Sequence, residues 1–319
     1  MIQNPNYNRF DLGDGKQGCV YYPHHLFFKS VQKVFPEYIT KIVIHSPKQQ
    51  MIQGLIKKIP KYPFFFYTFH QSSPIQVGQM NEQYIESTKP LKTQKEMVLL
   101  KYKNINIVSF NDWNNKSNKV CFQYFHYLVY SLEILLSHEM VHLEITDKTI
   151  LYHMDEDIPL IKITNQIIYI KDNIESILQT ILRFTTDDYP CPIEIYIIQY
   201  LQNNNVDSLS ITNIYEIIQN YKNQYLLDLI DLISYFKQYI NKPTKQIIQE
   251  LMMFSNTWGN YSLAFLFLKL INQKTKQNQT QNSFLNQWVK VLESATHKNP
   301  TQRTILKDDM HNLNLFFMT

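Results

Sequence analysis

The spacing of apolar residues changes along this chain, and the change limits the folds that it can adopt. Before about residue 111, apolar residues gather in short runs such as YITKIVI (38–44) and MVLLKYKNINIVSF (97–110), which are typical of strands. After Asn173, nearly every segment has helical spacing, as in NIESILQTILRF (173–184). A strand-rich first part followed by a helical second part predicts an α+β fold.

Several segments refine this prediction. SPKQQMIQGLIKKIP (46–60) has a Ser-Pro start and a proline stop, which predict one short helix. VCFQYFHYLVYSLEILLSH (120–138) predicts a long helix, and residues 149–170 predict two or three short strands around an acidic turn. PFFFYTFH (63–70) is typical of a strand, and the polar segment NQKTKQNQTQN (272–282) of a mobile linker.

Composition excludes several classes of protein. Hydrophobic residues make up 44% of the 319 residues and charged residues 18%, which indicates a folded chain, and a formal charge of +4 is too small to indicate a nucleic-acid partner. Three distant cysteines without a C-x-x-C motif argue against thiolate zinc sites and disulfides, and favour a reducing compartment. There is no signal-peptide pattern and no apolar run of the roughly 18 residues that a membrane span needs, so we expect no membrane association.

A glycine cluster lies near the N-terminus. Gly13, Gly15, Gly18 and Val20 match the pattern G-x-G-x-x-G-x-V. In a dinucleotide-binding fold the third glycine opens a helix, but here a strand-like sequence follows and ends at Pro23. This context favours a hairpin that closes over phosphates, with Val20 packing on a base, although an ordinary glycine-rich hairpin fits the residues equally well.

A second motif, His138-Glu139-Met140-Val141-His142, reads H-E-x-x-H. On a helix, two histidines with this spacing can bind zinc, and Glu139 would be the general base of a hydrolase. That interpretation needs a third ligand, which no recognisable downstream element supplies. Glu144 also places a charge where such helices usually continue with apolar residues. A zinc-dependent hydrolase is therefore a remote alternative.

Read in another frame, the same stretch resembles the catalytic loop of the protein kinases. Leu132-Glu133 and Met140-Val141-His142 match parts of L-E-x-L-H-x-x-x-I-V-H-R-D-I-K-P-x-N-I-L, and Ile145 and Ile150-Leu151 fall at its apolar positions. Further elements follow in the family's order: the glycine cluster before the loop, and three segments after it. These three are Pro192-Ile193-Glu194, similar to A-P-E, TWGNYSLAFLFLKLI (257–271), similar to a buried helix that begins D-x-x-S-L-G, and HKNPTQR (297–303), whose arginine would pair with the A-P-E glutamate.

The amino-acid sequences of these segments are most similar to those of the divergent kinases of large DNA viruses. The resemblance implies a bilobal fold, with a small β-rich N-lobe over residues 1–102 and a larger helical C-lobe over residues 103–319. It implies that His142 is the structural histidine of the loop. It also implies that Glu194 and Arg303 form a buried ion pair in the C-lobe.

The resemblance also shows which working residues are replaced. Glu144 stands at the position of the catalytic base, where the family has aspartate, and Thr146 replaces the loop lysine. Thr149 replaces the asparagine that holds a magnesium ion, and Asn165 or Thr164 occupies the D-F-G aspartate position, depending on the gap. Amide and hydroxyl oxygens are poor magnesium ligands beside carboxylates. We therefore expect phosphoryl transfer to be lost.

Other supporting groups are replaced as well. Lys41 is the expected phosphate-binding lysine, with Lys33 as the alternative, and the helix at 46–60 offers it only glutamines as partners. Gly259 stands where the buried helix normally begins with aspartate, so the brace under the catalytic loop is absent.

Together these replacements predict a pseudokinase that binds a protein partner and binds ATP weakly or not at all, with magnesium contributing little. A divergent active serine/threonine kinase that uses Glu144 and Asn165 is the alternative, and a structural virion component is a third hypothesis. The expected location is intracellular, either the host cytoplasm or the virion if the protein is viral. The sequence predicts neither a nucleic-acid nor a membrane partner, and it leaves the oligomeric state open.

Overall fold

The computed structural model describes residues 18–21, 38–44, 46–75, 97–103, 107–184, 191–221, 229–278 and 283–318. The chain divides into two compact units, and each is described separately. The first unit comprises residues 1–110 and 148–163, and the second comprises residues 111–147 and 164–319. The division predicted at residues 102 and 103 stays a prediction.

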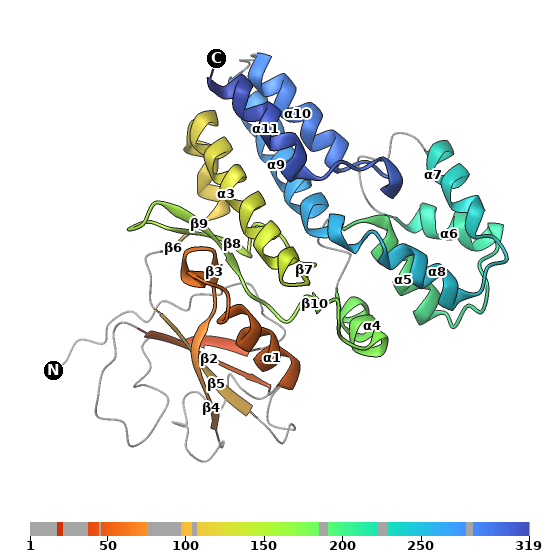
Figure 1. Cartoon of the computed structure of the whole chain (residues 1–319), viewed down its shortest axis with the longest axis horizontal. Helices are drawn as coiled ribbons and strands as arrows, with labels where there is room; N and C mark the ends of the chain where they lie inside the picture. Colours follow the sequence, from red (N-terminus) through yellow and green to blue (C-terminus); the bar gives the residue numbers. More distant parts are fainter. Residues whose placement is uncertain are drawn as a thin grey trace. The chain divides into compact units, whose positions relative to one another are not determined.

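Two sheets, one α-helix and a short 3-10 helix make up the described part of the first unit (Figure 1). The antiparallel first sheet has the order β1-β2-β5-β4, and the second has the order β3-β9-β8-β6, in which β3 pairs with β9 in parallel. The strands are β1 (Gly18–Tyr21), β2 (Tyr38–Ile44), β3 (Phe66–Tyr67), β4 (Phe69–Ile75), β5 (Met97–Lys103), β6 (Ile107–Ser109), β8 (Ile150–His153) and β9 (Ile158–Lys162).

The core of this unit follows from alternation along β5. Val98, Leu100 and Tyr102 are buried, because every second side chain of a strand points to the same face. They pack with apolar side chains of both sheets. The core cluster comprises Tyr67, Phe69, Val98, Leu100, Tyr102, Leu151 and Leu160.

The predicted helix at 46–60 is confirmed as α1 (Pro47–Ile56). The hydroxyl of Ser46 accepts a hydrogen bond from the backbone N–H of Gln49 at 3.3 Å, and Pro47 occupies the first turn, where its missing N–H costs nothing. Ile52 and Ile56 are buried one turn apart. This spacing explains why the apolar pattern predicted the helix correctly.

The prediction of one strand over residues 63–70 is wrong. The 3-10 helix η2 (Tyr62–Phe64) occupies the start, and the strand residues that follow belong to β3 and β4, which pair in different sheets. Lys61, which precedes η2, has a φ of 57°, so the chain turns sharply there. SVQKVF (30–35), whose sequence is also typical of a short strand, lies outside the described residues.

Helices dominate the second unit. α3 begins after Ser117, whose hydroxyl accepts a hydrogen bond from the backbone N–H of Val120 at 3.3 Å. The helices are α3 (Asn118–Ser137), α4 (Ile174–Arg183), α5 (Ile193–Asn203), α6 (Ile211–Asn220), α7 (Leu229–Phe236), α8 (Thr244–Met252), α9 (Trp258–Asn278), α10 (Ser283–Ala295) and α11 (Leu306–Met318). Among the described residues of this unit, one short sheet accompanies the helices, and in it β7 (Met140–His142) pairs with β10 (Ile167–Tyr169).

Within this unit, helices α3, α9, α10 and α11 lie together, as do α5, α6 and α8 (Figure 1). An aromatic cluster joins helices of the first group. Trp288 of α10 contacts Phe125 of α3 and Phe267 of α9, with ring centroids 5.6 and 6.0 Å apart. Trp113, in the 3-10 helix η5 (Phe110–Asn115), contacts Phe267 at 6.0 Å. Aromatic contacts at these distances stabilise cores beyond the area that they bury.

The predicted linker at 272–282 is wrong for its first seven residues, because α9 continues through Asn278. Lys274 explains the helix. Its side chain is buried, and its ammonium donates to the carbonyl oxygens of Trp113 and Lys116 and, at 2.9 Å, to that of Asn114. A polar sequence therefore forms a packed helix, since the buried charge has long-range backbone partners.

The fold class is α+β, as the sequence predicts. No helix in the described ranges is both long enough and apolar enough to cross a membrane.

Candidate functional site

Pairing of β7 with β10 brings two of the predicted catalytic segments together. His142 lies opposite Ile167, and the backbone N–H of Leu143 donates to the carbonyl oxygen of Gln166 at 2.9 Å. Glu144 and Asn165 are each the next residue beyond this hydrogen bond. The segments that hold the predicted base and the predicted D-F-G position therefore run side by side in the second unit.

His142 is buried, and its ring shapes the chain that leads to Glu144. Nδ1 of His142 accepts a hydrogen bond from the backbone N–H of Glu144 at 3.2 Å. Because this nitrogen accepts, the neutral ring carries its proton on Nε2. His142 thus has a structural contact within the loop, with the backbone of Glu144.

The other replaced positions lie in both units. In the second unit Thr146 and Thr164 are buried, and the Thr164 hydroxyl accepts a hydrogen bond from the backbone N–H of Gln166 at 3.1 Å. Thr149 is buried in the first unit, where its carbonyl oxygen accepts a hydrogen bond from the backbone N–H of Lys162 at 2.8 Å. The two predicted magnesium positions therefore carry Thr149 and either Asn165 or Thr164, none of which has a carboxylate.

Gly259 packs against the chain at His142. A Cβ atom added to Gly259 would lie 3.6 Å from the carbonyl oxygen of His142 and 3.5 Å from Cδ2 of Leu132, which are ordinary contact distances. A cavity of about 20 Å³ lies beside Gly259, and its lining includes Glu133 and Asn260. One oxygen of each side chain, Oε1 and Oδ1 respectively, is buried without a hydrogen-bond partner. The cavity has the size and polarity for about one water molecule.

The H-E-x-x-H residues do not form the helix that a zinc hydrolase requires. α3 ends at Ser137, His138 is its C-cap, and His142 lies on β7. Glu139 has a left-handed φ of 61°, and its carboxylate pairs with Lys171 at 2.7 Å. The two histidines therefore do not share a helix face, and the geometric basis of the zinc interpretation is absent. No group of three or more His, Cys, Asp or Glu residues in the described ranges is arranged to hold a metal ion.

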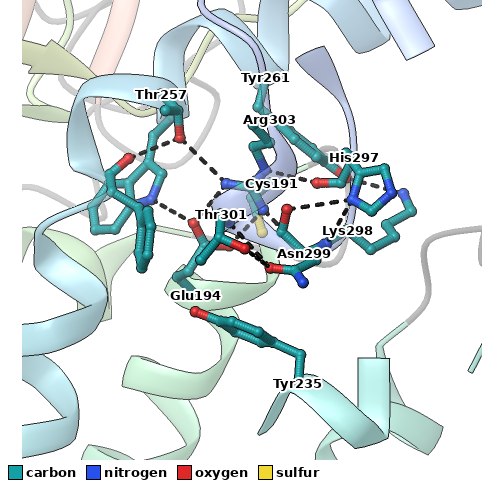
Figure 2. Close-up of polar contacts among 12 residues, drawn as sticks. Cys191, Glu194, Tyr235, Thr257, Tyr261, His297, Lys298, Asn299, Thr301 and Arg303 are labelled. Atoms are coloured by element: carbon teal, nitrogen blue, oxygen red, sulfur yellow. Dashed lines mark hydrogen bonds and ion pairs between the residues drawn. The ribbon is translucent and has the colours of Figure 1, made fainter. Parts of the chain in front are cut away.

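The predicted ion pair between Glu194 and Arg303 is confirmed (Figure 2). Arg303 Nη1 donates to Glu194 Oε1 and Nη2 donates to Oε2, each at 2.6 Å, and both side chains are fully buried. Burial alone would lower the pKa of the Arg303 guanidinium, but the charge of Glu194 and its hydrogen bonds outweigh that effect and raise the pKa. The pair is thus charged and bidentate.

Several helices hold this ion pair in place. Trp258 Nε1, at the start of α9, donates to Glu194 Oε1 at 3.1 Å. Arg303 Nε donates to the carbonyl oxygen of His297 at 2.8 Å, and the guanidinium lies 4.9 Å from the ring centroid of Tyr261. Because these groups come from α5, α9 and the chain on both sides of the 3-10 helix η8 (Pro300–Gln302), the pair fixes how those segments meet.

The predicted phosphate-binding residues are described only in part. Gly13, Gly15 and Lys33 lie outside the described residues. The structure gives the backbone of Gly18, Val20 and Lys41, and the register of β1 and β2 sets Val20 opposite Lys41 and Gly18 opposite Val43. Gln53, one of the glutamines that α1 offers as a partner for Lys41, is buried.

The sequence did not predict a cluster of residues around the ion pair. Lys298 Nζ donates to the hydroxyl of Tyr261 at 3.2 Å, and the Tyr261 hydroxyl lies 3.2 Å from that of Tyr221. Only the position of Lys298, inside the segment that supplies Arg303, could have drawn attention to it.

No family model matches the chain, and no curated protein matches its sequence.

Proposed function

We propose that this chain is a protein-kinase-like protein with degraded catalytic motifs, a pseudokinase that acts by binding a protein partner. The proposal includes a bilobal fold with a β-rich N-lobe and a helical C-lobe. Nucleotide is optional in this function, and ATP binds weakly or not at all.

The observation that carries the proposal is the Glu194–Arg303 pair. The resemblance of Pro192-Ile193-Glu194 to A-P-E, and of the segment ending at Arg303 to its partner element, predicted this contact across 109 residues. Few pairs of residues at such a separation meet by chance with both side chains fully buried. The contact therefore supports the kinase-like interpretation over interpretations that explain a single motif, such as the zinc hydrolase read from H-E-x-x-H.

Two further contacts support the same frame. The segment taken as the catalytic loop pairs with the segment taken as the D-F-G region, through His142 and Ile167. Gly259, taken as the start of the buried helix, packs against the carbonyl of His142, where the frame expects that helix to brace the loop.

The residues at the reaction positions do not fit a magnesium nucleotide. Magnesium prefers carboxylate and phosphate oxygens, and the predicted ligand positions supply Thr149 and either Asn165 or Thr164. The base position holds Glu144, which is one methylene longer than aspartate, and a displacement of about 1 Å can reduce rate about a hundredfold. We therefore derive no phosphoryl-transfer step for this chain.

A thermal-shift titration tests the nucleotide part of the proposal. We expect ATP to raise the melting temperature slightly or not at all, and to do so equally with magnesium and with excess EDTA. Backbone N–H groups of a glycine loop can bind phosphate without a metal, which is why weak binding is compatible with the proposal. Stabilisation that appears only with magnesium would favour the divergent active kinase instead.

A transfer assay tests the loss of activity. The full chain is incubated with γ-labelled ATP and generic protein substrates, beside a Glu144→Gln control. We expect no labelling above that control. Labelling by the natural sequence that disappears in Glu144→Gln would establish an active kinase and refute the proposal.

A further inference from the structure

Lys298 is a partly buried cation without an anionic partner. Its ammonium donates to the Tyr261 hydroxyl at 3.2 Å and lies 5.6 Å from the ring centroid of the same residue. In the part of the chain that the structure describes, it forms no ion pair. Glu194, the carboxylate of this cluster, is taken up by Arg303 at 2.6 Å through both oxygens.

The neighbouring titratable groups do not supply a negative charge. Burial raises the pKa of Tyr261 to about 12 and raises that of the Cys191 thiol, so both stay protonated at neutral pH. Burial also raises the pKa of Tyr235, on α7. The His297 ring, next to Lys298 in the chain, accepts a hydrogen bond from a backbone N–H and is no anion (Figure 2).

A chain of hydrogen bonds fixes where the protons lie. The Tyr221 hydroxyl donates to the carbonyl oxygen of Cys191 at 2.8 Å, because a carbonyl can only accept. Tyr221 has no second proton, so the Tyr261 hydroxyl donates to Tyr221 at 3.2 Å. The Tyr261 oxygen must therefore accept from Lys298. A neutral amine at Lys298 would use one N–H in this chain and keep its lone pair for reaction.

We propose that Lys298 is a nucleophilic amine that takes an acyl group from a thioester, and is thus a site of covalent acylation. The neutral amine attacks the thioester carbonyl, the new N–C bond forms, and the C–S bond breaks. The thiolate leaves with the electron pair and takes up the proton that the nitrogen releases. The product amide is uncharged, so acylation removes the unpaired cation beside Arg303.

The environment supplies the neutral amine. Burial, and to a lesser extent the positive charge of Arg303, lowers the pKa of Lys298 to about 8. At pH 7.5 such an amine is neutral in roughly one molecule in four, whereas an ordinary lysine with a pKa of about 10.4 is neutral in roughly one in a thousand. Lower basicity offsets part of this gain, as it does for thiols. The net expectation is acylation roughly ten times faster than at an exposed lysine.

The test uses the full chain and S-acetyl-N-acetylcysteamine, a simple thioester, at pH 7.5. Mass spectrometry of peptides gives the acetylation rate at Lys298 and at Lys290, an exposed lysine on α10 that is the internal reference. We expect Lys298 to react at least about tenfold faster, with a rate that levels off between pH 8 and 9. The reaction at Lys290 should continue to accelerate at higher pH.

Two controls keep the result specific. Lys298→Arg and Lys290→Arg chains identify the two peptides. In guanidinium chloride the two rates should converge, because the unfolded chain lacks the Tyr261 and Arg303 environment. Equal rates in the folded chain, or a rate at Lys298 that rises in parallel with Lys290 up to pH 10, would overturn the proposal.

Discussion

The Glu194–Arg303 pair provides the sharpest test of the fold. The conservative change Glu194→Gln keeps the size and shape of the side chain and removes its charge. Arg303 then stays buried, with one amide oxygen in place of two carboxylate oxygens. Arg303→Met removes the other partner and leaves the Glu194 carboxylate with the hydrogen bond that Trp258 Nε1 donates to it.

The size of the effect follows from burial. Both side chains are fully buried and the two hydrogen bonds measure 2.6 Å. Breaking such a pair by removing one partner costs about 3–5 kcal/mol, because the other charge stays buried without compensation. We expect each single variant to lower the free energy of unfolding of the second unit by about this amount.

Tryptophan fluorescence during urea unfolding measures this change. All three tryptophans, Trp113, Trp258 and Trp288, lie in the second unit and are buried, so the signal reports on that unit. The double variant Glu194→Leu/Arg303→Met should lose clearly less than the sum of the single losses, since it leaves no unpaired charge.

The surface pair Lys242–Glu250 is a matched control. It has a similar geometry, with Lys242 Nζ 2.9 Å from Glu250 Oε2, but each side chain is 31% exposed. Glu250→Gln should therefore cost less than about 1 kcal/mol. If Glu194→Gln were no more destabilising than Glu250→Gln, the conclusion that burial determines the strength of the pair would be refuted.

Three further predictions concern other parts of the structure. Lys274→Met should destabilise the second unit by about 2–4 kcal/mol in urea unfolding, because three carbonyls lose a charged donor, whereas Lys276→Met, exposed on the same helix, should change little. Gly54→Ala and Gly259→Ala should each stabilise by about 0.5–1 kcal/mol, since both are helical and neither new methyl group meets an atom closer than 3.5 Å; a clear loss at either site would contradict this packing. Lys298 has a pKa of about 8 in the folded chain, below its unfolded value of about 10.4, so between these values the unfolded state binds more protons and stability rises with pH. Lys298→Met should therefore be more stable than the natural chain below pH 8, by about 1–3 kcal/mol, and the difference should shrink towards pH 10; a difference independent of pH would show that Lys298 is not buried as a cation.

Local patterns predicted the elements whose signals lie close together in the sequence. Ser46-Pro47 and the apolar residues that follow predicted α1, and the acidic turn at 155–157 predicted the hairpin of β8 and β9. In the helix and in the hairpin, the residues that cap or turn the chain lie next to the element that they end. These signals are local, and the structure confirms both elements.

Long-range contacts explain the failures. The segment 272–278 is polar, and nothing nearby indicates that Lys274 reaches backbone carbonyls about 160 residues away. α11 (Leu306–Met318) was not predicted, since its charged and polar residues weaken the helical pattern. H-E-x-x-H has helical spacing but no helix, because the left-handed Glu139 ends the turn after α3.

The candidate site was predictable only through the family resemblance. Spacing alone gives no reason to connect Glu194 with Arg303, and the structure confirms the contact that the resemblance implied. The Lys298–Tyr261–Tyr221 chain had no such guide, because its members come from three segments without a shared motif. Hydrogen-bond direction there follows from the Cys191 carbonyl, which only the structure brings close.

The buried ion pair also bears on what the chain is for. Replacing such a pair with apolar residues of similar volume is often neutral or stabilising, so net stability does not explain its presence. Its specific effect is geometric: a bidentate contact between residues 109 positions apart fixes the start of α5 against the start of α9 and the chain after η8. None of these segments contains Glu144, Thr146 or Asn165. The ion pair that orients these helices is therefore intact, whereas the predicted reaction positions are altered, and this combination is what the proposed pseudokinase function predicts.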